Sequence, residues 1–193
     1  MLMKYITPYL YKVTCATCGG LSTLPIDMLQ TKILTNNSIN VNFNEFKYMF
    51  AMCNIFAFQN IIYTNSDFIF NKSLRGIFAG FIITPSVVYF KMQQYYNRLN
   101  VLPKYKYFIF LTFFREILFY SILYTLYASN LKYNKFLAPL IANSLAFPLK
   151  VLTVKYSYKT FNIKTNNIKY SALIEILKSA IGDSIALFLI YKN

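Results

Sequence analysis

The 193-residue chain contains no histidine and no tryptophan, and only three cysteines and six acidic residues. The lack of histidine excludes imidazole acid–base catalysis, and three cysteines cannot by themselves supply the four ligands of a structural zinc site. Charged residues make up 13% of the chain, against roughly 25% in soluble domains. Neither a Gly-rich phosphate loop nor a paired-carboxylate site is present. The sequence therefore predicts no enzyme, no metal site and no catalytic cofactor.

Two of the cysteines, Cys15 and Cys18, form a CxxC pair, a spacing found at redox and metal sites. Haem attachment would need a histidine where Gly19 stands, and the one further cysteine is Cys53. We interpret the pair as small residues that pack inside an apolar segment.

Hydrophobic residues make up 56% of the chain, and 20 Lys and Arg face 6 Asp and Glu, for a formal charge of +14. In a soluble protein this excess would indicate nucleic-acid binding. Here the basic residues lie between apolar segments, as in loops that flank membrane spans. We therefore expect a lipid bilayer and no nucleic acid as a partner. Six segments approach the roughly 20 residues that span a bilayer, at 9–30, 48–65, 76–96, 107–128, 135–155 and 171–191.

The first, third and fifth segments share one pattern. Each carries a proline, and Pro25, Pro85 and Pro148 are 60 and 63 residues apart. Each proline follows a pair of small residues four apart, which lets membrane helices approach closely; the pairs are Cys15 with Gly19, Gly76 with Gly80, and Ala138 with Ala142. A Lys-Tyr dipeptide begins each following segment, at Lys47-Tyr48, Lys106-Tyr107 and Lys169-Tyr170.

These three landmarks at near-constant offsets predict an internal threefold repeat. The fold class is all-α, with six transmembrane helices arranged as three helical hairpins. Residues 1–193 form one domain, and the repeats cover about 5–70, 71–130 and 131–193.

The residues that close each odd segment resemble the signature of the mitochondrial carrier family, Pro-x-Asp/Glu-x-x-Lys/Arg-x-Lys/Arg. "PIDMLQTK" matches at Pro25, Asp27 and Lys32, with Gln30 in the inner basic position. "PSVVYFKM" keeps Pro85 but has Val87 for the acid, and its Lys91 comes one place early. "PLKVLTVK" keeps Pro148 and Lys155 but has Lys150 where the acid belongs.

The resemblance implies a six-helix bundle with pseudo-threefold symmetry around a solute cavity, in the mitochondrial inner membrane. It also implies that the prolines kink the odd helices, and that acids and bases of the three repeats pair to close the matrix side. The gate-like residues are Asp27, Gln30, Lys32, Lys150 and Lys155. Since Asp27 is the one acid at a motif position, we expect it to contact Lys150, Lys155 or Lys32.

Arg115 and Glu116 lie near the middle of the fourth segment, and Asp183 lies within the sixth. Charges at such depth normally face a cavity or a partner. One interpretation makes them contacts for a solute in the cavity. The other makes them members of an internal ion-pair network, for example one that joins Lys178 to Glu175 or Asp183.

Three functions remain open from the sequence. The missing motif acids and short repeats favour an accessory or structural subunit of an inner-membrane complex. The alternatives are a divergent carrier of a small anionic metabolite and an unrelated polytopic protein. No cofactor is expected beyond a bound lipid such as cardiolipin. Ten basic residues flank the odd-to-even loops against seven elsewhere, which predicts that these loops lie in the matrix and both termini in the intermembrane space.

Overall fold

The computed structural model describes residues 3–36, 38–39, 43–66, 68–69, 71–127, 134–158, 163–183 and 185. Within these residues the fold is all-α and contains six α-helices, as the sequence predicted. They are α1 (Met3–Thr35), α2 (Asn44–Asn65), α3 (Lys72–Leu99), α4 (Tyr105–Tyr127), α5 (Asn134–Ser157) and α6 (Thr165–Lys178), followed by a short π-helix, η1 (Ser179–Asp183).

The helices α1, α2, α3 and α5 each contain the segment that the sequence predicted for them, and α4 contains its segment up to Tyr127, since residue 128 lies outside the described part of the chain. The sixth segment differs. That segment was expected at 171–191, whereas α6 begins at Thr165 and ends at Lys178. The chain continues as η1 to Asp183, and residues 184 and 186–191 lie outside the described part of the chain.

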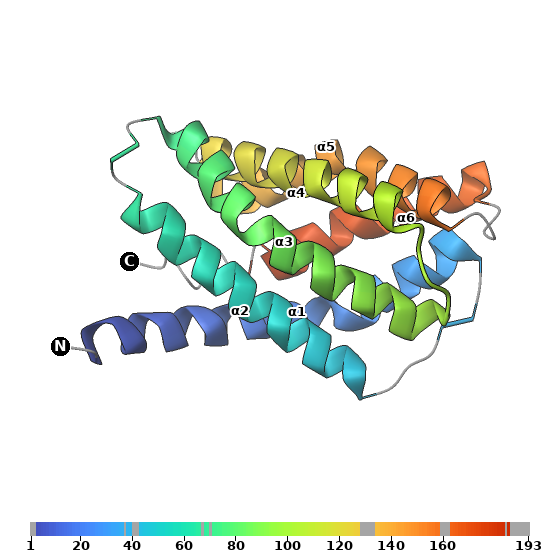
Figure 1. The fold of residues 1–193 in the computed structure, drawn as a ribbon, viewed down its shortest axis with the longest axis horizontal. Helices are drawn as coiled ribbons and strands as arrows, with labels where there is room; N and C mark the ends of the chain where they lie inside the picture. The colour runs from blue at the N-terminus through green and yellow to red at the C-terminus, as the bar shows by residue number, and fades with distance from the viewer. Residues whose placement is uncertain are drawn as a thin grey trace.

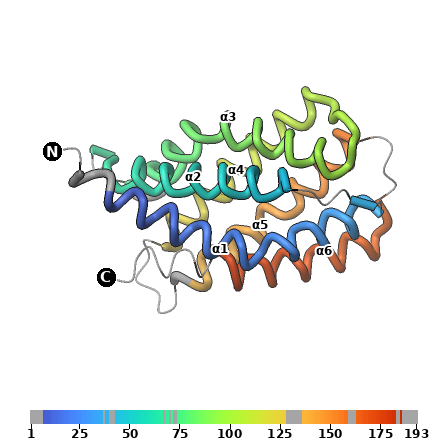
Figure 2. Tube along the Cα trace, turned by 90° about the horizontal axis from the view of Figure 1, so that it is seen from below, coloured from blue at the N-terminus to red at the C-terminus, as the bar shows by residue number. Residues whose placement is uncertain are grey.

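The six helices form a closed ring in chain order. Each helix packs against the next, and α6 packs against α1. Successive helices run in opposite directions along the bundle (Figure 1). Figure 2 shows α6 lying along the second half of α1, which closes the ring. The odd helices therefore end, and the even helices begin, at the same end of the bundle.

Two apolar clusters fill different halves of the ring. The first lies where α3 begins and α4 ends; it includes Ala79, Ala142 and the rings of Tyr63 and Tyr124, which stack with centroids 4.0 Å apart. The second lies where α3 ends and α4 begins, and it includes Phe108 and Tyr158. The polar residues that remain between these clusters define the candidate site.

The small-residue pairs occupy helix contacts. All six of their members are buried. A Cβ atom added at Gly76 would lie 3.0 Å from both the carbonyl oxygen of Tyr120 and the Cβ of Tyr124. Glycine at this position therefore allows α3 to approach the backbone of α4.

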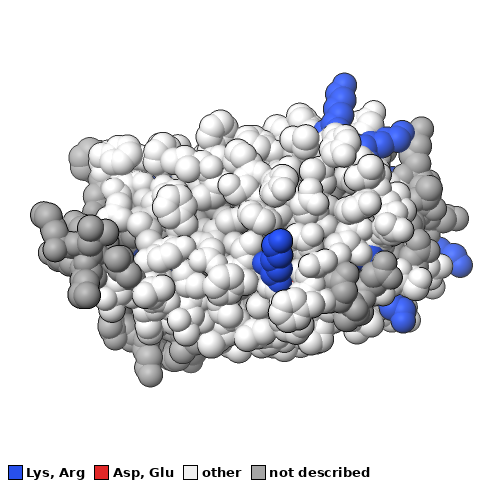
Figure 3. All heavy atoms as spheres, turned by 60° about the horizontal axis from the view of Figure 1, so that its bottom comes forward, with Lys and Arg blue, Asp and Glu red and all other residues white. Residues whose placement is uncertain are grey.

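Three helices are long and apolar enough to cross a membrane, over Leu74–Leu99, Tyr105–Tyr127 and Phe136–Ser157. The outer surface agrees with contact to lipid, since Phe81, Phe110 and Phe114 are all about half exposed. Figure 3 shows one face that is mostly uncharged, with most of its Lys and Arg toward one end, one near the middle, and no Asp or Glu in view. Length and composition thus support three of the six predicted spans.

Candidate functional site: a buried ion-pair network beside a cavity

Every acidic residue whose side chain the structure describes belongs to one network inside the ring. Each of the six helices contributes at least one charged side chain to this network. The members are Asp27 on α1, Glu45 on α2, Lys91 and Arg98 on α3, Arg115 and Glu116 on α4, Lys150 on α5, and Glu175 and Lys178 on α6. Among the side chains that the structure describes, five cations thus meet four carboxylates in this network.

Arg98, at the end of α3, joins the first three helices. Its side chain is 1% exposed. Its Nε atom donates to the carboxylate of Glu45 at 2.9 Å, its Nη2 atom lies 2.8 Å from the same oxygen, and its Nη1 atom donates to Asp27 at 2.7 Å. It also donates to Thr31 Oγ1 at 2.8 Å. Gln94 and Asn97, on the same helix, donate to Glu45 as well. Arg98 is therefore held by partners on α1 and α2.

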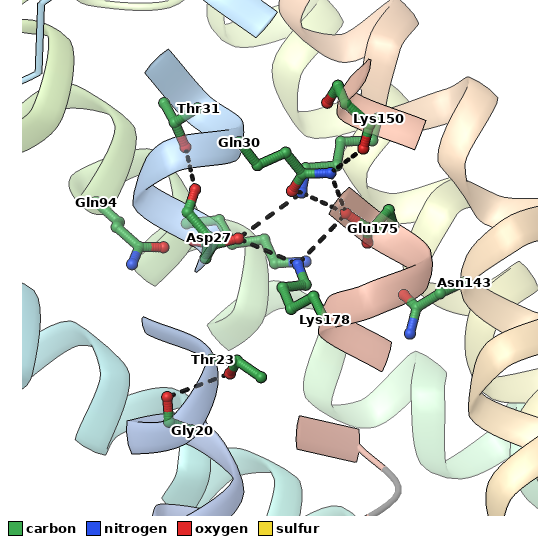
Figure 4. A network of polar contacts seen from close by, with 12 residues as sticks. Gly20, Thr23, Asp27, Gln30, Thr31, Gln94, Asn143, Lys150, Glu175 and Lys178 are labelled. Atoms are coloured by element: carbon green, nitrogen blue, oxygen red, sulfur yellow. Dashed lines mark hydrogen bonds and ion pairs between the residues drawn. The ribbon is translucent and has the colours of Figure 1, made fainter. Parts of the chain in front are cut away.

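Glu175, on α6, joins the other half of the ring. Its carboxylate accepts from Gln30 at 2.6 Å and from Lys150 at 2.9 Å, and lies 3.4 Å from Lys178 Nζ and 3.5 Å from Arg115 Nη2. Lys150 also donates to the side-chain oxygen of Gln30. Figure 4 shows these side chains converging from α1, α5 and α6.

Asp27 connects the two halves. One carboxylate oxygen accepts from Arg98, and the other lies 3.1 Å from Lys178 Nζ and 3.8 Å from Lys150 Nζ. The predicted contact between Asp27 and Lys150 is therefore present. Arg98 and Lys178 lie closer to Asp27, however, and the sequence analysis did not name either as its partner.

The two other lysines that the sequence offered for this contact, Lys32 and Lys155, lie elsewhere. Lys32 and Lys155 are exposed, and Lys155 lies over the ring of Tyr156 at 5.9 Å from its centroid. Each lysine follows its inward-facing residue, Asp27 or Lys150, by five positions. At about 100° per residue, a five-residue step turns a side chain roughly 140° away from the inner face.

Gln30 follows Asp27 by three positions, and residues three apart share a helix face. This spacing explains why the inner motif position, unlike the outer one, joins the network. The three motif prolines, Pro25, Pro85 and Pro148, lie inside α1, α3 and α5.

Arg115 and Glu116 belong to the network, as one of the two interpretations predicted. Glu116 accepts from both Lys91 and Arg115, and Lys178 lies within ion-pair distance of Glu175. Asp183 lies in η1, and its side chain is outside the described part of the molecule. Glu45 and Arg98 carry no motif that marked them as functional residues in the sequence. The small number of acidic residues could have pointed to them, because each carboxylate in an apolar chain needs a cation as a partner.

A cavity of about 230 Å³ adjoins this network inside the ring. Its charged lining comes from Asp27, Lys91, Arg115, Glu116 and Lys178. Arg115 is 8% exposed, and its Nε atom has no hydrogen-bond partner among the described residues. A smaller cavity of about 70 Å³ shares Asp27, Lys91, Arg115 and Lys178 with it and also reaches Lys150. The interior of the ring thus contains a cavity lined partly by charged side chains. It adjoins an arginine whose Nε atom has no hydrogen-bond partner among the described residues.

The cysteines lie near this space without forming a metal site. Cys53 lines the larger cavity, while Cys15 is buried and Cys18 is exposed. In the described part of the chain, no group of three or more His, Cys, Asp or Glu side chains is arranged to hold a metal ion.

Comparison with protein-family models, with curated proteins and with solved structures finds no match to this chain. The resemblance to mitochondrial carriers therefore depends on the motif residues themselves.

Proposed function

We propose that this protein is an integral membrane carrier that moves a small anionic solute through the centre of a six-helix ring. In this proposal all six helices cross the bilayer, and α1, α2 and α6 are held there by their neighbours in the ring. The membrane is the mitochondrial inner membrane, as the carrier-like motif implies.

The observation that carries the proposal is the cavity next to a network of buried charges to which all six helices contribute. Buried charges destabilise a membrane protein unless they are paired, so their presence at this depth favours a functional role. The three cations that line the cavity, Lys91, Arg115 and Lys178, favour an anion as the solute.

The network weakens one of the two reasons for preferring a structural subunit, the missing motif acids. The sequence analysis found one acid, Asp27, at the positions where carriers close their matrix side. Glu45 and Glu175 supply carboxylates from the even helices instead. Pairs of this kind hold one end of the ring together, and they can exchange partners if solute binding compensates for the loss.

A second candidate is the accessory subunit that the sequence favoured. It is supported by the breadth of the network, which links all six helices and pairs every described carboxylate. Such a network would also suit a bundle that serves only as a rigid membrane scaffold.

Release of labelled anions from preloaded proteoliposomes distinguishes the two candidates. We expect the wild-type protein to release part of an anion mixture faster than protein-free vesicles do. The double variant Asp27→Leu with Lys178→Leu removes one charge of each sign, and we expect it to fold but to release no anion. Equal release by both proteins, or no release by either, would contradict the carrier proposal. Comigration of the wild-type protein with a larger complex after gentle purification would then favour the subunit.

A further inference from the structure

The two cavities inside the ring share part of their lining, and two of the shared residues are neighbours on one helix. The shared residues are Asp27, Lys91, Gln94, Arg115 and Lys178. Lys91 and Gln94 are three positions apart on α3, so their side chains lie on the same face of that helix. This face of α3 therefore borders the interior space from the larger cavity to the smaller one.

Lys91 is the lining cation with the fewest partners in the described part of the chain. The guanidinium of Arg115 reaches two carboxylates and one amide, and Lys178 lies between Asp27 and Glu175. Lys91, in contrast, contacts one carboxylate among the described residues, that of Glu116, and its side chain keeps 21% of its exposure. A lysine ammonium has three N–H donors. Lys91 can therefore donate to a further acceptor in the cavities.

The contact between Lys91 and Glu116 can also be exchanged at low cost. Glu116 accepts from Arg115 as well as from Lys91. If Lys91 turns toward a solute, the Glu116 carboxylate keeps a cation and is not left as an unpaired buried charge, which is the costly outcome.

Gln94 offers an acceptor one helical turn from that ammonium. Its Nε2 atom donates to the carboxylate of Glu45 at 3.2 Å. An ionised carboxylate only accepts hydrogen bonds, so this contact sets the orientation of the amide. The oxygen, Oε1, has no hydrogen-bond partner among the described residues. In Figure 4 the Gln94 side chain extends from α3 toward Asp27.

We propose that Lys91 and Gln94 bind the solute together, and that they recognise an anion with a hydroxyl group beside its acid group. The acid group accepts from the Lys91 ammonium, and the hydroxyl donates to Oε1 of Gln94. A hydroxyl supplies the donor without adding a second charge to the solute. This inference rests on the proposed function, because it names two specificity-determining residues and the solute class for the same site.

Thermal unfolding of the purified full chain in detergent tests this recognition. The probes are glycolate and lactate, with acetate and propionate as counterparts that lack the hydroxyl, and lactamide as a neutral analogue that keeps it. The rise of the unfolding midpoint with ligand concentration gives each dissociation constant. Each hydroxy acid should bind about 2–12-fold more tightly than its counterpart, as expected for one net hydrogen bond. Lactamide should give no increase.

Variants assign the two contacts. Gln94→Leu should remove the preference for the hydroxy acids and leave the binding of acetate and propionate unchanged. Gln93→Leu is the matched control, because Gln93 is the neighbouring residue on α3 and is not among the residues that line either cavity. Lys91→Gln should weaken the binding of every acid by about tenfold or more, since it removes a charged donor. Lys106→Gln, at an exposed position on α4, should bind all the acids as the wild type does.

The test does not depend on one variant. If Lys91→Gln does not fold, the wild-type probe series and Gln94→Leu still decide the question. In Gln94→Leu the carboxylate of Glu45 keeps Arg98 and Asn97 as partners.

Three results would overturn the inference. Equal affinity for the hydroxy acids and their counterparts, or an unchanged preference in Gln94→Leu, would refute the role of Gln94 and leave an anion site in place. Unchanged binding in Lys91→Gln would refute the role of Lys91. Equal stabilisation by lactate and lactamide, or none by any probe, would refute recognition of the acid group. Anion release from proteoliposomes tests the carrier function separately, because unfolding does not measure movement across the bilayer.

Discussion

The carboxylate of Asp27 on α1 accepts a hydrogen bond from the guanidinium of Arg98 on α3 at 2.7 Å. Arg98 is also held by Glu45, and the second oxygen of Asp27 faces Lys178. Asp27 is therefore the residue through which the half of the network on α2 and α3 meets the half on α5 and α6. This position makes it the most informative residue to change.

Asp27→Asn should lower the free energy of unfolding by about 2–3 kcal/mol. Removal of one partner from a fully buried ion pair costs ~3–5 kcal/mol. We expect less here because the Asp27 side chain keeps 25% of its exposure. Denaturant unfolding in detergent micelles measures the change, and Lys32→Gln, an exposed lysine on the same helix, is the control.

The double variant Asp27→Leu with Lys178→Leu should recover much of that loss, because it removes both partners and leaves no unpaired charge between them. A loss in the double variant equal to the sum of the two single losses would show that the pair is not coupled. Recovery would confirm the coupling that the 3.1 Å contact implies.

Glu45→Gln should be more damaging than Asp27→Asn. The Glu45 side chain is 1% exposed, and it accepts hydrogen bonds from Gln94, Asn97 and Arg98. A full loss of ~3–5 kcal/mol is expected for such a site. Lys47→Gln, two residues further on the exposed side of α2, should change the unfolding free energy by less than about 0.5 kcal/mol. Similar effects of the two substitutions would contradict the assigned role of Glu45.

The sequence predicted the helices well because apolar length and proline-centred repeats are local properties of the chain. It identified Asp27, Gln30 and Lys150 because the carrier motif places their side chains on one helix face. It missed the pairing of Glu45 with Arg98, which lie 53 positions apart. That pair depends on how α2 and α3 are oriented against each other, and no motif or helix period encodes this orientation.

Gly76→Ala and Gly80→Ala should differ in their effect on stability. A methyl group at Gly76 would lie 3.0 Å from the Tyr120 carbonyl oxygen and the Tyr124 Cβ, neither of which can rotate away. At Gly80 the nearest atoms, in the Tyr120 side chain, are 3.3 Å away. We expect a loss of about 1–3 kcal/mol for Gly76→Ala from overpacking. The change for Gly80→Ala should be near zero, because the gain of ~1 kcal/mol in helix propensity offsets the tighter contact. Equal losses in unfolding experiments would contradict the close approach of α3 and α4 at Gly76.

The lysine-rich end of the bundle should face the mitochondrial matrix. Exposed lysines gather where the odd helices end and the even helices begin; they are Lys32, Lys47, Lys104, Lys106, Lys155, Lys164 and Lys169. Lys and Arg are enriched in the loops on the inner side of a membrane, which for the mitochondrial inner membrane is the matrix side. Protease added to mitochondria with ruptured outer membranes should therefore remove a tag from either terminus. Protection of both tags would reverse the topology.

The reactivity of Cys53 from each side of the membrane tests the carrier proposal most directly. Cys53 lines the central cavity and is 6% exposed. With Cys15 and Cys18 changed to alanine, it is the only thiol, and an impermeant thiol reagent can be added to either side of oriented proteoliposomes. Lys104→Cys in a chain without other cysteines controls for sidedness, because a residue at the exposed end should react from one side only. A carrier exposes its cavity alternately to both sides, so we predict that Cys53 reacts from both. Reaction of Cys53 from one side alone, or from neither, would contradict the proposal.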